Sequence, residues 1–341
     1  MTTWGVAFVG FLSAWVWNEI FLRFARRLGA LSQGIPNQRR WDSRRKPIIG
    51  GIAFFIAALG LGAWRPAGAE VSHAFLAGGS IAFLTGLADD AFVSLPHIKL
   101  LGQLAAAAAS LLFGGHLLEV GNTPLSLLFT FFWYVAVMNA FNMMDNMDGI
   151  SGTIALVLLS SSFFWLSDSS HLLLYAALSG GVLAFLYRNW HPSHLYMGDN
   201  GSQFLGFVLA YWGAELWNSP PLMPISVWEK ILLLIGLFAL LAGDTFWVIL
   251  VRLWEKRSPF NGGTDHLTHR LARQGFSPTH IAIALGLGQI LLVLACAMAV
   301  LQGWLPWIPL LLIGVSGVAI GFFHLSELKQ PSLAKQAEVG G

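Results

Sequence analysis

Asn139-Ala-Phe-Asn-Met-Met-Asp-Asn-Met-Asp-Gly-Ile-Ser-Gly152 is the segment on which the fold prediction rests. It lies between two long apolar runs, at 125–141 and 153–166, each of which we interpret as a membrane helix. Its side chains able to bind metal or hydrogen-bond a sugar are Asn139, Asn142, Asp145 and Asp148. The last three share one face if the preceding helix continues through them. Carboxylates at a membrane boundary are costly unless they are paired, metal-bound or hydrated, although a structural polar loop is the alternative.

The composition indicates a membrane protein. Of the 341 residues, 56% are hydrophobic and only 11% are charged, whereas a soluble domain has about 25% charged residues. Backbone groups inside a bilayer must be satisfied within helices, so the predicted fold class is an all-α polytopic membrane protein. We expect one transmembrane catalytic domain over 1–325 and a short cytoplasmic tail over 326–341. The single cysteine, Cys296, lies in an apolar run and is predicted to fill the core.

Apolar runs long enough to cross a bilayer, or nearly so when tilted, number about eleven. They lie at 4–22, 49–64, 71–88, 100–118, 124–141, 152–167, 171–187, 202–217, 228–251, 280–301 and 305–324. With the N-terminus outside, 17 of the 19 lysines and arginines fall on inner loops, the exceptions being Arg65 and Lys230. This asymmetry predicts the N-terminus outside, the C-terminus in the cytoplasm and an active site on cytoplasmic loops.

Two inner loops before the central segment carry charges suited to phosphate chemistry. The basic loop at 34–51 is either a topogenic signal or a phosphate contact. In the next loop, the adjacent carboxylates of Asp89 and Asp90 repel each other, which tends to raise one pKa and suits a metal ligand or proton acceptor. Lys99 begins the following helix, where it can neutralise a phosphate or simply pair with the acidic helix end.

The loop at 187–206 contains one carboxylate with an unobstructed backbone. Gly198 and Gly201 flank Asp199, and Ser202 is predicted to be the N-cap of the next helix. A zinc pair formed by two nearby histidines in this loop is disfavoured, because a proline separates them and no thiol is near.

The loop at 252–271 follows an apolar run that contains Asp244, a carboxylate that needs a partner or a cavity. His266 and His269 are three residues apart and precede Arg270, which puts imidazole and guanidinium groups on one short face. Arginine binds phosphate oxygens with two parallel hydrogen bonds, so we favour a phosphate-binding role over a metal site for this face.

Taken in order, these loops resemble the polyprenyl-phosphate N-acetylhexosamine-1-phosphate transferase superfamily over nearly the whole chain. The similar segments are Pro36-Asn37 to Gly51, Asp89-Asp90 with Lys99 to Gln103, Asn139 to Gly149, Met197 to Ser202, and Asp244-Thr245 followed by Arg252, Ser258 to Phe260 and His266 to Leu271. Thr268 stands where the family often has a histidine. This difference favours the branch that uses UDP-N-acetylglucosamine over the phospho-N-acetylmuramoyl-pentapeptide transferases, which remain the alternative.

The resemblance implies an enzyme of the bacterial inner membrane that transfers a sugar-1-phosphate from a UDP-N-acetylhexosamine to undecaprenyl phosphate. UMP is released, and a lipid-linked cell-envelope glycan is begun. The implied cofactor is Mg²⁺, with Mn²⁺ as an alternative, held by Asp199 and Asn142. Asp89 is the candidate base for the acceptor phosphate, and Asp90 is its orienting or metal-linked neighbour. The implied substrate-binding residues are Lys99, Asn139, Asp145, Asp148, Asn189, His266, His269 and Arg270.

Three further questions stay open at the level of sequence. A covalent phospho-aspartyl route is an alternative to direct attack. A transporter is a rival class, but transporters gather polar residues near the middle of the membrane, and here they gather at one face. Membrane lipid is an expected partner, a homodimer is not excluded, and no nucleic-acid partner is expected.

Overall fold

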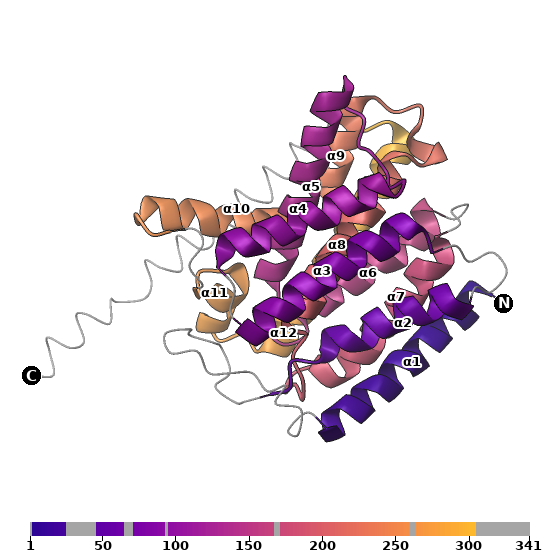
Figure 1. Ribbon diagram of the computed structural model, residues 1–341. Coiled ribbons are helices and arrows are strands. Elements are labelled where there is room, and N and C mark those ends of the chain that lie inside the picture. Colours follow the sequence, from indigo (N-terminus) through magenta and orange to yellow (C-terminus); the bar gives the residue numbers. More distant parts are fainter. Residues whose placement is uncertain are drawn as a thin grey trace, which may run out of the picture.

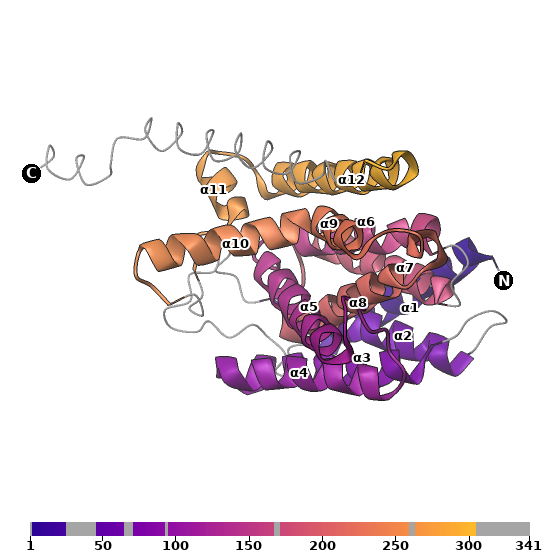
Figure 2. The same ribbon diagram turned by 90° about the horizontal axis from the view of Figure 1, so that it is seen from above.

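The computed structural model describes residues 2–24, 46–64, 71–92, 95–166, 171–258 and 263–304. Within these ranges the regular structure is helical, apart from one isolated bridge between Ile48 and Tyr196. The apolar run predicted at 305–324, the tail and most of the first basic loop lie outside the described residues. Figures 1 and 2 show the helices gathered into one bundle.

The helices follow one another along the whole described chain (Figure 1). They are α1 (Thr3–Phe24), α2 (Gly50–Trp64), α3 (His73–Phe92), α4 (Pro96–Leu112), α5 (Thr123–Met144), α6 (Ile150–Trp165), α7 (Leu172–Asn189), α8 (Gly198–Trp217), the 3₁₀ turn η1 (Pro220–Leu222), α9 (Val227–Leu237), α10 (Ala239–Trp254), α11 (Leu267–Arg273) and α12 (Pro278–Gln302).

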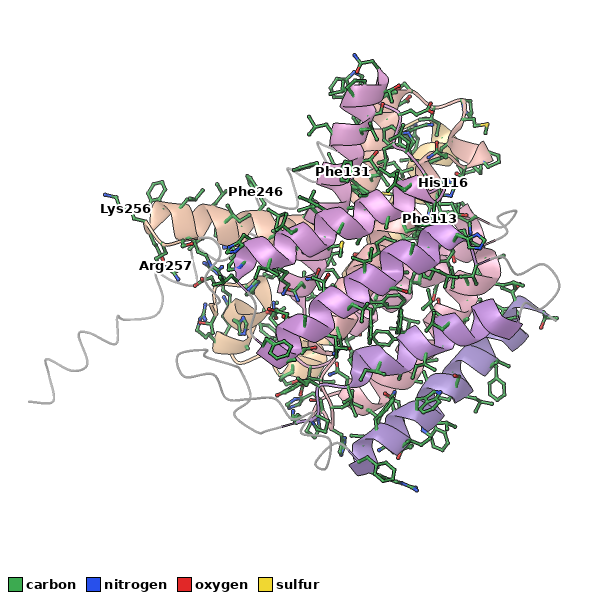
Figure 3. The ribbon with its side chains drawn as sticks, viewed as in Figure 1. Phe113, His116, Phe131, Phe246, Lys256 and Arg257 are labelled. Carbon is green, nitrogen blue, oxygen red and sulfur yellow. The ribbon has the colours of Figure 1, made fainter. Side chains whose placement is uncertain are left out.

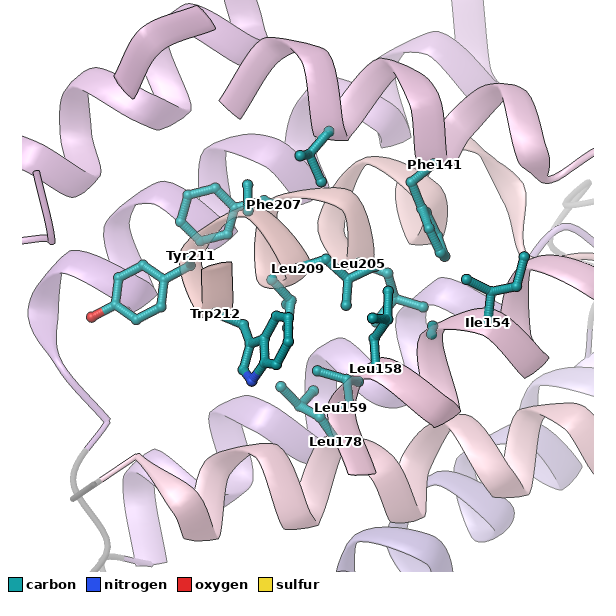
Figure 4. Close-up of a cluster of buried hydrophobic side chains, with 14 of the residues drawn as sticks. Phe141, Ile154, Leu158, Leu159, Leu178, Leu205, Phe207, Leu209, Tyr211 and Trp212 are labelled. Carbon is teal, nitrogen blue, oxygen red and sulfur yellow. The ribbon is translucent and has the colours of Figure 1, made fainter. Parts of the chain in front are cut away.

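Helix α8 is the centre of the bundle. Every residue from Asn200 to Trp217 is buried, and the helix contacts α2, α3, α5 and α6. Figure 4 shows Leu205, Phe207 and Trp212 of α8 among apolar side chains of α5, α6 and α7. A helix that is buried on all sides must be enclosed by other helices, so α8 and its neighbours fix one another's positions.

The outer helices expose large apolar side chains. Trp4 on α1 and Phe132 on α5 are well exposed, as is Leu291 on α12. Among the described residues, five helices are long and apolar enough to cross a membrane, or six if α9 and α10 form one bent span, and two shorter apolar helices accompany them. Because such surfaces are stable only against lipid, the protein is a multi-pass membrane protein. The prediction of eleven spans with the N-terminus outside stays a prediction.

Helix α4 differs from the predicted run at 100–118. It begins four residues earlier, because Pro96 at the first helical position has a backbone angle already suited to a helix. It ends six residues earlier, because Gly114 takes a left-handed conformation with φ of 89° just after the helix. The residues that follow therefore form an extended segment rather than more helix.

The predicted run at 228–251 is a bent pair of helices rather than one straight span. Helices α9 and α10 meet at Phe238 with an angle of 78°. Figures 1 and 2 show α10 leaving the bundle and running toward the side where α11 lies. The bend carries the carboxylate of Asp244 to α11, which a straight helix would not do.

Cysteine labelling tests the predicted orientation. The only native cysteine, Cys296, is buried, so single cysteines can be introduced without removing it. We expect a membrane-impermeant maleimide to label Met223→Cys in intact cells, because Met223 is exposed in the turn before α9. Glu255→Cys, exposed after α10, should react only after the cells are opened. The reverse pattern would overturn the orientation.

Candidate active site

The ammonium group of Lys99 joins four helices at one end of the bundle. Lys99 lies in the first turn of α4 and is half-buried. Its Nζ donates to Asp89 Oδ2 at 3.0 Å, to Asn142 Oδ1 at 3.2 Å and to Asp199 Oδ2 at 2.9 Å. These acceptors come from α3, α5 and α8. An ammonium has three donors, so each one has an acceptor from a different helix.

The amide of Asn142 strengthens this cluster. Its Nδ2 donates to Asp199 Oδ1 at 2.8 Å and also lies 2.7 Å from the hydroxyl of Ser202. Both carboxylate oxygens of Asp199 are therefore hydrogen-bonded, one to Lys99 and one to Asn142. We call Asp89, Lys99, Asn142 and Asp199 the Lys99 cluster.

Asp90 holds the N-terminus of α8. Its Oδ1 accepts from the backbone N–H of Asp199 at 2.9 Å, and its Oδ2 accepts from the backbone and side-chain nitrogens of Asn200 at 2.9 and 2.6 Å. Helix N-termini carry unpaired N–H groups and a partial positive charge, so a carboxylate there caps the helix. This cap comes from α3 rather than from the residue before α8, which makes no side-chain capping bond.

The prediction that Ser202 is the N-cap is wrong. Helix α8 begins at Gly198, and Ser202 lies inside its first two turns. Local sequence favoured Ser202, because serine is a common cap; the actual cap is Asp90, more than a hundred residues earlier. A Cβ at Gly86 would meet the backbone oxygen of Asp199 at 2.1 Å. Glycine at that position therefore allows α3 and α8 to approach closely enough for Asp90 to reach α8.

The polar residues of 139–152 do not share one helix face. Helix α5 ends at Met144, so Asn142 points to Asp199, while Asp145 and Asp148 lie beyond the helix and turn elsewhere. Asp145 accepts from Ser151 Oγ at 2.6 Å. The prediction of a shared face required the helix to continue to residue 148, but α5 ends at Met144.

Asp148 organises the segment before α8. It is buried and accepts from the backbone and hydroxyl of Ser193 at 3.2 and 2.7 Å. His191 Nδ1 lies 3.0 Å from the same carboxylate, and Lys46 Nζ lies 3.7 Å away. Asp148 therefore ties the turn after α5 to the segment that leads into Asp199.

Asn189 and Asn139 are engaged with protein groups. Asn189 Oδ1 accepts from the backbone of Gly149 at 2.9 Å, and its Nδ2 donates to a backbone carbonyl. Asn139 Nδ2 donates to Gln103 Oε1 at 2.8 Å, and Gln103 in turn donates to Gln203 at 3.0 Å. Both asparagines support the elements around the Lys99 cluster, and their direct contact with substrate stays a prediction.

Helix α11 is capped in the same way as α8. Asp244 on α10 accepts from His266 Nδ1 at 2.7 Å and from the backbone N–H of Leu267 at 2.8 Å. Thr268 Oγ1 donates to Asn146 Oδ1 at 2.6 Å, which fastens α11 to the turn after α5. Asp244, for which the sequence analysis predicted a partner or a cavity, therefore has its partners at the start of α11 and positions that helix.

The cationic face of α11 carries less charge than its sequence implies. Burial, together with the neighbouring His266 and Arg273, lowers the pKa of His269 to about 4, so its imidazole is neutral at neutral pH. The guanidinium of Arg270 lies over the ring of Trp247, 5.3 Å from its centre, and its Nε donates to the backbone of Asp265 at 3.1 Å. The permanent charges of this helix are thus those of Arg270 and Arg273.

The donor atoms of the Lys99 cluster fit a magnesium ion. Asp89, Asn142 and Asp199 each present an oxygen, which is the ligand type that Mg²⁺ takes. The three oxygens converge within 3.2 Å of one ammonium group, so the site already attracts a cation. A divalent ion held by Asp199 and Asn142 would compete with Lys99 for the same oxygens.

Three residues that support this site were not among the candidates predicted from the sequence. Asn200, Ser193 and Asn146 bond to Asp90, Asp148 and Thr268 respectively. Each pairing joins residues far apart in the chain, and no spacing rule links them. Their partners were identified only because they belong to charged or motif-bearing loops.

The fold and the site define a multi-pass membrane protein with a carboxylate and ammonium cluster at one end of its bundle. Residues 72–215 match the family model described as glycosyl transferase family 4. The chain is 30% identical over 293 residues to the probable undecaprenyl-phosphate N-acetylglucosaminyl 1-phosphate transferase of Bacillus subtilis strain 168, covering 80% of this chain and 78% of that protein.

Two other relatives are more distant. The decaprenyl-phosphate N-acetylglucosaminephosphotransferase of Mycobacterium tuberculosis is 28% identical, covering 76% of this chain and 73% of the relative. The undecaprenyl-phosphate alpha-N-acetylglucosaminyl 1-phosphate transferase of Escherichia coli O157:H7 is 24% identical, covering 91% and 89%. The chain belongs to glycosyl transferase family 4, and its resemblance to the polyprenyl-phosphate N-acetylhexosamine-1-phosphate transferase superfamily is confirmed.

Replacing Asp90 tests the cap on α8. Asp90→Ala leaves three donors of Asp199 and Asn200 without their acceptor, so we expect a loss of about 2 kcal/mol or more in unfolding free energy. Thermal unfolding in detergent, monitored by circular dichroism, measures this loss of stability. Glu255→Ala is the control, because Glu255 is an exposed carboxylate at the end of α10 rather than at a helix N-terminus. Equal losses in the two variants would contradict the cap.

The raised pKa of Asp145 leads us to expect that the stability of the protein depends on pH. Loss of hydration, reinforced by the nearby carboxylate of Asp199, raises the pKa of Asp145 to about 7 from an ordinary 3.8. The folded protein then binds the proton more tightly than the unfolded chain. The contribution of Asp145 to the free energy of unfolding therefore falls as pH rises from about 4 through 7. We expect Asp145→Asn to raise the unfolding midpoint relative to wild type more at pH 8 than at pH 5.5, measured without divalent ions. A difference independent of pH would refute the assignment.

Proposed function

We propose that this protein transfers N-acetylglucosamine-1-phosphate from UDP-N-acetylglucosamine to undecaprenyl phosphate and releases UMP. The observation that carries the proposal is the Lys99 ammonium bonded to Asp89, Asn142 and Asp199 at one end of an apolar helix bundle. The relatives are named as transferases of N-acetylglucosamine phosphate to undecaprenyl or decaprenyl phosphate, which supports the choice of acceptor and sugar.

The location of the cluster suits the two substrates. A polyprenyl chain needs an apolar surface, and the outer helices expose such a surface. A nucleotide sugar needs water, and the cluster lies at the helix ends, where α3 finishes and α4 and α8 begin. On the orientation proposed for the chain, this end faces the cytoplasm of a bacterial cell.

The reaction is a displacement at phosphorus. An oxygen of the lipid phosphate attacks the β-phosphorus of the donor, and a new P–O bond forms while the bond to the UMP oxygen breaks. The electron pair of the broken bond leaves with UMP. A phosphate monoester has its second pKa near ~6, so it is largely ionised at neutral pH. Asp89, held against Lys99, accepts the remaining proton where one is present, and Lys99 stabilises the negative charge at phosphorus.

Asp199 and Asn142 would hold a magnesium ion, which when bound screens the charge between the two anionic reactants. Asp90 is the positioning residue for this pair, because it fixes the turn of α8 on which Asp199 stands. The Arg270 guanidinium binds donor phosphate oxygens, and the neutral His269 can contribute hydrogen bonds but no charge. Asp145 and Asp148 shape the turn that faces the nucleotide and sugar.

Transfer of radiolabelled sugar phosphate tests the function. Purified protein in detergent, with Mg²⁺ and undecaprenyl phosphate, should convert UDP-N-acetylglucosamine to a lipid product and UMP. Asp199→Asn should reduce turnover at least about 100-fold, because it removes the carboxylate that would hold the magnesium ion. The control His280→Ala, exposed at the start of α12, should retain full activity.

Other outcomes would change the proposal. Near-normal turnover in folded Asp199→Asn would remove Asp199 from the mechanism, and no transfer from any UDP-N-acetylhexosamine would defeat the proposal. Exclusive use of UDP-N-acetylmuramoyl-pentapeptide would assign the other branch of the superfamily. A burst of UMP in the absence of acceptor would indicate a covalent enzyme intermediate rather than direct attack.

A further inference from the structure

A second cluster of ionisable side chains lies at the opposite end of the bundle. It consists of His116, His171 and Glu215, one potential ligand atom of each lying within 4.8 Å of the other two. His171 Nδ1 is 3.1 Å from Glu215 Oε1. Figure 3 places His116 beyond the end of α4, on the other side of the molecule from Lys256 and Arg257. We call these three residues the His116 cluster.

The cluster is separate from the proposed active site. Asp199 and Glu215 lie on the same helix, α8, one in its first turn and one in its last. At about 1.5 Å of rise per residue, about 24 Å of helix separates them. No side chain of the Lys99 cluster can span that distance, so the His116 cluster needs its own explanation.

Three segments that are distant in sequence meet there. His116 belongs to the extended segment after α4, and His171 directly precedes α7. Glu215 is buried near the end of α8. The ring of Tyr211 packs against both imidazoles, with centroids 5.6 Å from His116 and 5.8 Å from His171. The two histidines are therefore held on one aromatic support beside the carboxylate.

A hydrogen bond from Tyr175 orients the carboxylate of Glu215. Tyr175 donates its hydroxyl to Oε2 at 2.5 Å, while Oε1 faces His171. Carboxylates that bind metal are commonly held by such an outer hydrogen bond, which leaves the other oxygen directed at the ion. A carboxylate buried this deeply is costly unless it is paired, and a metal ion shared with His171 would pair it as well as a protonated imidazole does.

The ligand types select the metal. Two imidazoles and one carboxylate form a three-residue set that zinc accepts, with a fourth position left for solvent. Imidazole favours zinc and its neighbours in the transition series over magnesium or calcium. Tetrahedral zinc with bonds of about 2.0–2.1 Å places its ligand atoms about 3.4 Å apart. The widest separation must therefore close by at most about 1.5 Å, which side-chain rotation can provide.

We propose that His116, His171 and Glu215 form a zinc site that ties the segment after α4 and the start of α7 to the end of α8. The ion would act as a structural clip at the end of the bundle away from the Lys99 cluster. On the proposed orientation, this end faces the outside of the cell membrane.

Metal binding to the full-length protein in detergent, with any affinity tag removed, tests the proposal. After treatment with a chelator and its removal, titration with ZnCl₂ should show one zinc ion per chain by elemental analysis. Titration with CoCl₂ should give the visible absorption of four-coordinate cobalt. Tyr175→Phe should weaken the affinity about 10-fold or more, because it removes the outer hydrogen bond to Glu215.

Variants separate this site from other histidines and from the active site. His116→Ala and His171→Ala should lose stoichiometric zinc, and the milder His116→Gln serves if the alanine variants do not fold. His73→Ala is the matched control, since His73 is exposed at the start of α3, and it should bind zinc as wild type does. Asp199→Asn should also retain zinc, which separates this site from the Lys99 cluster.

Thermal unfolding provides a readout that does not depend on activity. Zinc should raise the unfolding midpoint of wild type and of His73→Ala, but not that of His116→Ala or His116→Gln, because binding to the folded state alone stabilises it. Equal zinc binding by wild type and the His116 variants, or no stoichiometric binding by wild type, would overturn the proposal.

Discussion

The structure depends on one ammonium group with three acidic or amide partners from three other helices. Lys99 reaches Asp89, Asn142 and Asp199 at once, so the ends of α3 and α5 and the starts of α4 and α8 must lie at the same level of the bundle. Like charges repel, and two carboxylates this close together require a cation between them. In the free protein, Lys99 supplies that charge. In the proposed mechanism, the same oxygens of Asp199 and Asn142 would hold a magnesium ion, so the interaction that joins the helices also lies at the proposed site.

The pairing of carboxylates with helix N-termini gives the site its rigidity. Asp90 holds α8 and Asp244 holds α11, and both caps come from a different helix. The residues proposed to take part in the reaction, Asp199 and the α11 face, therefore stand at the start of helices whose first turns are held by a carboxylate from another helix. A catalytic carboxylate on a free helix end would instead fray with the first turn, where backbone bonds are weakest.

Sequence alone predicted much of this arrangement, but not its connections. Apolar runs located the helices within a few residues, since the bilayer demands long apolar segments and little else. The loop motifs located Asp89, Lys99, Asn142 and Asp199. The bend between α9 and α10 escaped prediction, because no proline marks it. The N-cap at Ser202 was wrong, because sequence rules consider only neighbouring residues. The His116 cluster was missed, because its three residues are isolated in the chain and lie at unremarkable positions.

The caps on α8 and α11 also bear on how the chain is made. Asp90 leaves the ribosome more than a hundred residues before the α8 backbone that it holds, whereas Asp244 precedes its own partner by only 23 residues. The first turn of α8 can therefore form its hydrogen bonds to Asp90 as soon as α8 is inserted, because α3 has been synthesised before it. Until then, a nascent chain that ends before α8 keeps the carboxylate of Asp90 without its native α8 partners.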